Sequence, residues 1–183
     1  MIERVLIAGS GGQGIVLIGR LLASAAVRTV PHVTFYPAYG AEVRGGTSNC
    51  QVILSTDEID SPLSERVDAM VVMNQMSADR FLPCATSATA LLLSRSLCQP
   101  PAGRGLRALM VPATQLAEEA GGARAANFVM LGAYLQQRPV VPSADLESAI
   151  GELMADKGAA VIDLNVRAFR AGADFARSAG TGQ

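Results

Sequence analysis

ERVLIAGSGGQG, at Glu3–Gly14, is the stretch that decides how this chain folds. It contains the continuously apolar run Val5–Ile7, which is typical of a short strand buried on both faces. The glycine turn Gly9–Gly14 follows at once, and an apolar stripe along Ile15–Arg28 predicts a helix after the turn. A strand, a glycine-rich turn and a helix in this order are typical of an α/β domain that binds nucleotides.

The spacing Gly9-x-Gly11-x-x-Gly14 matches the dinucleotide-binding fingerprint. Glycine tolerates positive φ and close backbone approach, and a helix start offers unpaired N–H groups to an anion. An acid that binds the ribose is expected about 20 residues later, at the end of the second strand. That strand, Val33–Pro37, has no acid, and Glu42 comes too late. The turn therefore predicts an anion cradle rather than an NAD site, and a tight turn that holds no ligand is the alternative.

The remaining pattern places short apolar strands in the first two-thirds of the chain and amphipathic helices in the last third. Strands are expected at His32–Tyr36, Cys50–Ser55, Asp68–Met73 and Ala88–Leu93, and helices at 77–82, 113–120, 125–137, from Ser143 as N-cap, and around 161–175. This predicts the α/β class, as a Rossmann-like three-layer sheet with helices on both faces and a helix-rich C-terminal third. We expect a single domain at 1–177 and a frayed tail at 178–183.

Composition narrows the class of partner. The formal net charge is −1 and aromatic residues make up 4 %, which argues against nucleic acid. Apolar residues reach 50 % while charged residues reach 17 %, below the roughly 25 % of soluble domains, so a subunit interface is expected and the isolated chain could form a homodimer. A large alanine-rich core is the alternative. No apolar run approaches the roughly 20 residues that span a bilayer, and Met1–Arg4 has no signal-peptide layout, so we expect a cytoplasmic protein.

Residues able to carry out catalysis are scarce. Cys50, Cys84 and Cys98 form no CxxC pair, which argues against a zinc or iron–sulfur site and favours free thiols. His32 is the only histidine, and no Ser–His–acid triad can be assembled around it. The sequence therefore predicts no catalytic and no metal-binding residues. Asn74, directly after a buried strand, stands where α/β sheets place ligands.

The second informative motif is EVRGGTS at 42–48. Arg44 could hold a phosphate or carboxylate in a bidentate fork, and Thr47 adds a hydroxyl. Gly45 and Gly46 allow the backbone to approach another group closely. The alternatives are an ion pair between this arginine and the glutamate of the same loop, or a solvated arginine in a flexible hairpin.

Two long motifs, GSGGQG at Gly9–Gly14 and YGAEVRGGTSNCQV at Tyr39–Val52, closely resemble the gamma subunit, or gamma-type domain, of 2-oxoacid:ferredoxin oxidoreductases. The resemblance covers nearly the whole chain, except 85–109. It continues at Ser61-Pro62, Asn74-Gln75, Ser77, Arg80-Phe81, Pro112–Thr114, Asn127, Leu131-Gly132, Asn165, Ala168-Phe169 and Gly172. The spacing Asn74-Gln75-x-Ser77-x-x-Arg80-Phe81 looks most like the 2-oxoglutarate-type branch.

The resemblance implies a function that depends on partners. These enzymes oxidatively decarboxylate a 2-oxoacid with coenzyme A, giving an acyl-CoA and reduced ferredoxin. Thiamine diphosphate and iron–sulfur clusters would reside on alpha, beta and possibly delta subunits, with ferredoxin reached through the complex. This chain would assist coenzyme A binding and assembly. The residues expected to contact coenzyme A, or alternatively the active-site face of a partner subunit, are Gly9, Gly11, Gly12, Gln13, Gly14, Arg44, Gly45, Gly46, Thr47 and Asn74.

Three other interpretations stay open. The chain could serve an indolepyruvate, pyruvate or branched-chain enzyme of the same family, because substrate choice is expected on the thiamine-bearing subunits. It could instead be a free-standing nucleotide-binding Rossmann-like protein, or a scaffold with a vestigial site.

Overall fold

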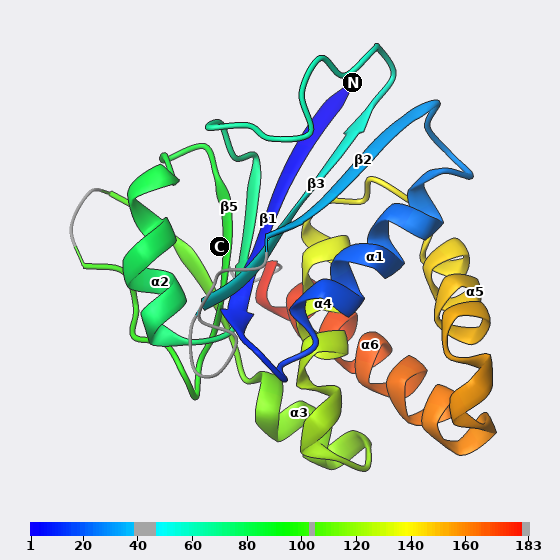
Figure 1. The fold of residues 1–183 in the computed structure, drawn as a ribbon. Helices are drawn as coiled ribbons and strands as arrows, with labels where there is room; N and C mark the ends of the chain where they lie inside the picture. The colour runs from blue at the N-terminus through cyan, green and yellow to red at the C-terminus, as the bar shows by residue number, and fades with distance from the viewer. Residues whose placement is uncertain (39–46, 103–104, 181–183) are drawn as a thin grey trace.

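The computed structural model describes residues 1–38, 47–102 and 105–180. Within them, six strands form one mixed sheet in the order β2-β3-β1-β4-β5-β6 (Figure 1). The strands are β1 (Ile2–Ser10), β2 (His32–Ala38), β3 (Thr47–Ser55), β4 (Ala69–Val72), β5 (Ala90–Ser94) and β6 (Ala108–Val111). The predicted α/β class is confirmed.

Helices cover both faces of the sheet, as expected for three layers, but they cover them unequally (Figure 1). One face carries α1 (Ile15–Ala26), α3 (Ala113–Ala120), α4 (Ala126–Gln137), α5 (Ser143–Leu153) and α6 (Ala159–Gly180). The other face carries the short α2 (Gln75–Phe81) and the 3-10 turn Leu82–Cys84. Successive side chains of β1 point to opposite faces of the sheet. Val5 and Ile7 therefore join the core under the larger layer, while Leu6 joins the core under α2. No helix in the described parts of the chain is both long and apolar enough to cross a membrane.

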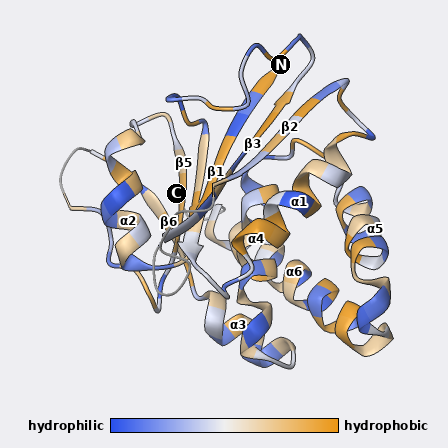
Figure 2. Cartoon of the chain, viewed as in Figure 1, coloured by the Kyte–Doolittle hydropathy of each residue, from blue (hydrophilic) through white to orange (hydrophobic). Residues whose placement is uncertain are grey.

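The helix α4 lies at the centre of the larger layer, and Figure 2 shows it as strongly hydrophobic. It is buried from Asn127 to Leu135, on all its faces. Its backbone approaches α6 so closely that an added Cβ on Gly132 would lie 1.9 Å from the carbonyl oxygen of Phe169. An added Cβ on Gly172 would lie equally close to the carbonyl oxygen of Val129. Glycine at these two positions therefore sets the spacing of the two helices.

The order of the strands gives the sheet a mixed character. The strand β1 pairs in parallel with β4, β4 with β5, and β5 with β6. On its other side β1 pairs antiparallel with β3, and β3 pairs antiparallel with β2. The βα unit that opens the chain thus leads to a β2 that is parallel to β1 but separated from it by β3. The sheet is therefore not a regular parallel Rossmann sheet.

Several element boundaries differ from those expected, among them the start of α5 and the end of α6. The N-cap of α5 is Pro142, in extended conformation, and Ser143 is already helical, so the prediction of Ser143 as N-cap is wrong. Proline suits this position because its fixed φ and missing N–H cost nothing there. The last helix continues to Gly180, past the expected start of the tail at 178, with Arg177 bonded to Asp174 and to Gln136 of α4.

Candidate functional site

The candidate site lies where β1 and β4 end side by side. The chain leaves β1 through Gly9–Gly14 into α1 on one face of the sheet, and leaves β4 through Asn74 into α2 on the opposite face (Figure 1). Such a point, where the connections of two neighbouring parallel strands diverge, opens a crevice outside their carboxyl ends. α/β proteins bind ligands in this crevice, so the described part of the predicted site occupies a suitable position.

The glycine turn has the backbone that its sequence predicts. Gly12 has φ 89° and Gly14 has φ 72°, both in the left-handed region that favours glycine. Gly14 is the N-cap of α1 and supplies no side chain to the first N–H groups of that helix. An added Cβ on Gly9 would lie 2.7 Å from Oε1 of Gln13, and Gly11 is exposed. The start of α1 is therefore a backbone cradle without a side-chain cap.

Two amides tie this turn to the end of β4. Oε1 of Gln13 accepts the N–H of Ser10 at 2.7 Å, and Nε2 donates to the carbonyl oxygen of Met73 at 3.3 Å. Nδ2 of Asn74 donates to Oε1 of Gln13 at 3.2 Å and to Oγ of Ser10. The structure thus brings the predicted residues Gln13 and Asn74 together.

The start of α2 is anchored to the same network. Oδ1 of Asn74 accepts the N–H of Ser77 at 2.8 Å and so caps the helix. Oγ of Ser77 donates to the carbonyl oxygen of Gly9 at 3.0 Å. The sequence-based list of site residues omitted Ser77 and Ser10. The available signal for Ser10 was its position as a small hydroxyl residue at the end of the buried strand β1, whereas Ser77 lies within α2 and has no such local signal.

A third element, α4, supports the turn from below. Nδ2 of Asn127 donates to the carbonyl oxygen of Gly14 at 3.3 Å. The amide lies so close that an added Cβ on Gly14 would meet Nδ2 at 2.2 Å. Oδ1 of Asn127 is buried without a partner among the described residues. Asn127 therefore fixes the turn that starts α1 and was missing from the predicted list.

The start of β3 completes the described site. Thr47 lies opposite Ser10 in the β1–β3 ladder. Its Oγ1 accepts a hydrogen bond from Nη1 of Arg80 at 2.7 Å, and the Arg80 guanidinium lies 5.4 Å from the centre of the Phe81 ring. The other predicted residues of this motif, namely Arg44, Gly45 and Gly46, lie outside the described residues.

These groups can bind an anion but offer little for catalysis. The described site contains amides, hydroxyls, backbone N–H groups and one guanidinium. The Sγ of Cys98 lies 3.8 Å from the carbonyl oxygen of Val72 in β4, and burial raises the pKa of this thiol to about 11. Burial raises the pKa of Cys50 to about 12. Both thiols are therefore protonated at neutral pH, and no cluster of metal-ligating side chains occurs within the described ranges.

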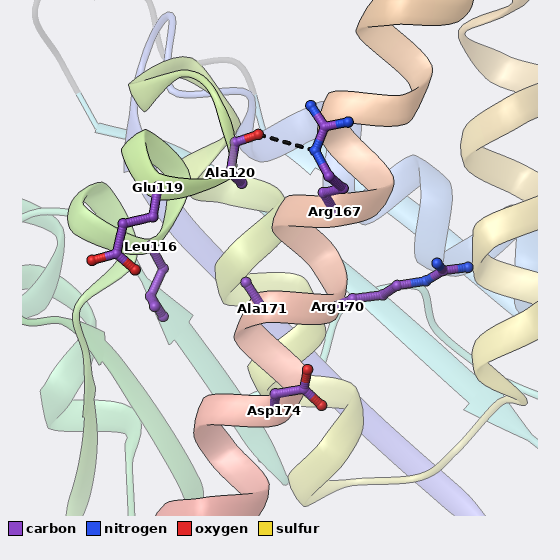
Figure 3. Close-up of a pocket in the computed structure, with 7 residues that line it drawn as sticks. All are labelled: Leu116, Glu119, Ala120, Arg167, Arg170, Ala171 and Asp174. Atoms are coloured by element: carbon purple, nitrogen blue, oxygen red, sulfur yellow. Dashed lines mark hydrogen bonds between the residues drawn. The ribbon is translucent and has the colours of Figure 1, made fainter.

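A separate hollow of about 310 Å³ lies between α3 and α6 (Figure 3). It is lined by Leu116, Glu119, Ala120, Arg167, Arg170, Ala171 and Asp174. Its two arginines are already engaged, because Arg167 donates to the carbonyl oxygen of Ala120 and pairs with Asp163, while Arg170 pairs with Glu147. Figure 3 shows Arg170 pointing away from α3. This hollow is less suited to an anion than the crevice between β1 and β4.

Comparison with known proteins agrees with this geometry. The family model described as pyruvate ferredoxin/flavodoxin oxidoreductase matches residues 4–175. The ketoisovalerate oxidoreductase subunit VorA of Methanothermobacter thermautotrophicus is 41 % identical over 95 % of this chain, which spans only 36 % of that protein. The 2-oxoglutarate synthase subunit KorC of Archaeoglobus fulgidus is 31 % identical over 94 % of this chain and 87 % of its own length.

Solved structures share the fold. The gamma subunit of a keto/oxoacid ferredoxin oxidoreductase from Geobacter sulfurreducens superposes with a TM-score of 0.81 at 26 % identity, covering 96 % of this chain and 99 % of its own. A 2-oxoglutarate:ferredoxin oxidoreductase from Magnetococcus marinus, solved with coenzyme A bound, has a TM-score of 0.88 at 24 % identity. It covers 97 % of this chain, which matches 31 % of that one, and at this identity the likeness concerns the fold alone.

These relatives confirm the family and correct one prediction. The ketoisovalerate subunit is more similar to this chain than the 2-oxoglutarate subunit, at 41 % against 31 % identity, so the preference for the 2-oxoglutarate branch is not supported. Asn74 and Ser77 of this spacing are bonded to the glycine turn and Arg80 is bonded to Thr47 of β3, so these residues have contacts within this chain. On its sequence, its fold and the relatives above, the chain belongs to the pyruvate ferredoxin/flavodoxin oxidoreductase family.

Proposed function

We propose that this chain is the gamma-type component of a cytoplasmic 2-oxoacid:ferredoxin oxidoreductase and that it binds the phosphate groups of coenzyme A. One observation carries the proposal. Gln13 and Asn74 join the glycine turn to the end of β4, so that the backbone cradle lies at the carboxyl ends of β1 and β4, where the connections of these strands diverge. None of the hydrogen bonds that join these described residues involves a carboxylate, which would repel an anion.

Partners supply the chemistry in this proposal. Thiamine diphosphate would activate the 2-oxoacid, and iron–sulfur clusters would carry the electrons to ferredoxin, both on alpha, beta or delta components. The described residues of this chain offer neither a general base nor a metal site. The chain spans about a third of the VorA relative, which supports the idea that it works beside further domains. Arg44, Gly45 and Gly46 remain predicted contacts of coenzyme A on sequence grounds.

For the substrate we propose a branched-chain 2-oxoacid. The support is the higher identity to the ketoisovalerate subunit than to the 2-oxoglutarate subunit, at 41 % against 31 %. The reconstituted enzyme should therefore use ketoisovalerate with a higher kcat/KM than 2-oxoglutarate, indolepyruvate or pyruvate. A preference for any of the other three would overturn the substrate assignment and leave the role of this chain standing.

The role is tested by co-expression with the alpha and beta subunits encoded next to it. We expect a stable complex that reduces ferredoxin when 2-oxoacid and coenzyme A are both present. Replacing Gln13 by Ala removes hydrogen bonds that shape the cradle, so KM for coenzyme A should rise roughly 3- to 10-fold. KM for the 2-oxoacid should stay unchanged, because that substrate reacts on another subunit.

The matched control is Gln115→Ala, which removes the same amide from an exposed position on α3. It should leave both KM values unchanged. If no complex forms, or if activity with coenzyme A is the same without this chain, the proposed function is wrong. Saturable micromolar binding of NADH by the isolated chain would favour the free-standing nucleotide-binding protein instead.

A further inference from the structure

Arg80 has an unusual position among the charged residues of this chain. It lies in the last turn of α2, exposed, and donates through Nη1 to Oγ1 of Thr47 at 2.7 Å. Its guanidinium lies 5.4 Å from the centre of the Phe81 ring, a distance at which a cation over an aromatic face is stabilised. The side chain is therefore held in one place by a hydroxyl and a ring. Both partners are uncharged, so the positive charge of the guanidinium is not neutralised.

Positive charge suited to a phosphate is scarce near the cradle. Lys157, the only lysine, lies in the 3-10 turn before α6 and pairs with Asp156. Six arginines have carboxylate partners, namely Arg4, Arg28, Arg138, Arg167, Arg170 and Arg177. Among the described residues, Arg80 has no carboxylate within ion-pair distance, as is also true of Arg20, Arg66, Arg95, Arg107 and Arg124, but it is the one of these that donates to Thr47. The neighbouring Asp79 is bonded to Gln75 instead.

The position of Thr47 links Arg80 to the cradle. Thr47 is paired with Ser10 across the β1–β3 ladder, and Ser10 is bonded to Gln13 and Asn74. Directly paired residues in an antiparallel ladder have Cα atoms about 5 Å apart, so Arg80 is hydrogen-bonded to a residue that lies beside Ser10 of the glycine turn. The backbone of the glycine turn and the guanidinium beside it suit a ligand with two adjacent anionic groups.

We propose that Arg80 binds the diphosphate of coenzyme A together with the glycine turn, and that the Thr47 hydroxyl orients it. The turn would hold one phosphate through backbone N–H groups, while the planar guanidinium holds the next one bidentately. The 3′-phosphate of coenzyme A is separated from the diphosphate by a ribose and suits this pair of groups less well. This inference rests on the proposed function and adds a charged contact to it.

The test uses the assembled complex with coenzyme A as the varied substrate. Arg80→Ala should raise KM for coenzyme A about tenfold or more, with KM for the 2-oxoacid unchanged, because a charged hydrogen-bonding partner of the phosphate is lost. Arg80→Lys keeps the charge but not the fork, so it should recover part of the loss. Dephospho-coenzyme A lacks the 3′-phosphate. With this substrate, the ratio of the KM of Arg80→Ala to the KM of wild type should be the same as with coenzyme A.

Thr47→Val tests the orienting role. It should raise KM for coenzyme A less than Arg80→Ala does, and the double variant should be no worse than Arg80→Ala alone, since the hydroxyl acts through the arginine. The matched control is Arg66→Ala, which removes one exposed positive charge shortly before β4, at the end of that strand opposite to the site. It should change neither KM.

Each outcome separates this inference from the proposed function. If Gln13→Ala raises KM for coenzyme A and Arg80→Ala does not, Arg80 is outside the site and only this inference fails. If neither variant changes KM in an intact complex, the proposed function fails as well. If Arg80→Ala weakens assembly with the partner subunits at unchanged KM, Arg80 binds a protein carboxylate and the assignment is overturned. If Arg80→Ala raises KM for coenzyme A but not for dephospho-coenzyme A, Arg80 binds the 3′-phosphate and the proposed contact with the diphosphate is wrong.

Discussion

Gly14 has the strictest geometry in the glycine turn, and this leads to a prediction about stability. Its φ of 72° and the 2.2 Å approach of Nδ2 of Asn127 to an added Cβ both oppose a side chain. Gly14→Ala should lower the free energy of unfolding by roughly 2–4 kcal/mol, the sum of a left-handed alanine and an overpacked contact. Urea denaturation of the isolated chain measures it.

Gly12 supplies the comparison. Its φ is 89°, but nothing lies within 4 Å of an added Cβ. Gly12→Ala should therefore cost only the backbone strain, about 1–2 kcal/mol. Equal losses for the two variants would mean that Asn127 moves aside without cost, contrary to its role as the support of the turn.

Cys50 makes stability depend on pH in the alkaline range. Burial raises its pKa from 9.0 to about 12 in the folded protein, so the folded state keeps a proton that the unfolded state releases. The stabilisation is complete below pH 9 and is lost as the pH rises toward 12, at up to about 1.4 kcal/mol per pH unit. Unfolding by urea under reducing conditions at pH 8.5 and 10.5 should show this loss.

Cys50→Ala is the variant that isolates the thiol. It should be less stable than wild type at pH 8.5, because a buried side chain is shortened. Its further loss between pH 8.5 and 10.5 should be smaller than that of wild type. If both proteins lose stability in parallel, other groups cause the pH dependence.

At this scale the sequence predicts those site residues whose role is local. Gln13 and the glycines belong to one turn, and Asn74 follows a recognisable strand. The local sequence pattern therefore indicates that these residues belong to a site. Ser77 and Asn127 could not be found in the same way. Their partners, Gly9 and Gly14, lie 68 and 113 residues away, and only the folded sheet and the packing of α4 bring them into contact.

Among the elements, α4 and α6 form the contact that tolerates least change. An added Cβ on Gly132 or Gly172 would lie 1.9 Å from a carbonyl oxygen of the other helix. Because backbone cannot yield as a flexible side chain does, Gly132→Ala and Gly172→Ala should each lower the free energy of unfolding by about 3 kcal/mol or more. Thermal and urea denaturation both measure this loss.

Gly151 in α5 is a matched helical glycine. Nothing lies within 4 Å of its added Cβ, and its φ is not positive. Gly151→Ala should be neutral or stabilise the protein by up to about 1 kcal/mol, since alanine has the better helix propensity. A similar loss at all three positions would argue against close helix approach as the cause.

The contrast between local sequence signals and contacts of distant residues explains which elements could be predicted. The bounds of α3, Ala113–Ala120, match the expectation because Pro112 and Gly121 mark both ends locally. The placement of β3 between β1 and β2 was not predicted. Hydrogen bonding between strands leaves no local signature in β3 that names its neighbours, so the sequence showed a βα unit but not the strand inserted into it.

Over the whole molecule, the two faces of the sheet have cores of very different size. Among the described residues, the core under α2 has eight buried hydrophobic residues, including Leu6, Met70 and Leu93, whereas the core under the other helices has 36. Local stability follows buried apolar contact, so we expect α2 to open before the rest. Native-state hydrogen exchange should show weaker protection for amides of α2 than for those of α4. Equal protection would mean that the two layers unfold as one unit.

The high apolar content is explained in part by this architecture. The nine buried residues from Asn127 to Leu135 mean that α4 needs almost no polar side chains. Other apolar side chains remain exposed, including Val27, Leu63 and Met76. The subunit interface expected from composition therefore stays a prediction, and complex formation in the co-expression experiment is its test.

The insertion of β3 between β1 and β2 also affects synthesis on the ribosome. When only β1, α1 and β2 have emerged, the two strands are not neighbours and have no ladder to form. The ladders of β3 with β1 and β2 can be completed only after Ser55 has left the exit tunnel, and the ladder of β1 with β4 only after Val72. In the nascent chain, β1 and β2 therefore stay unpaired until β3 has emerged. During this early part of translation we expect these strands to be the segments that a chaperone binds.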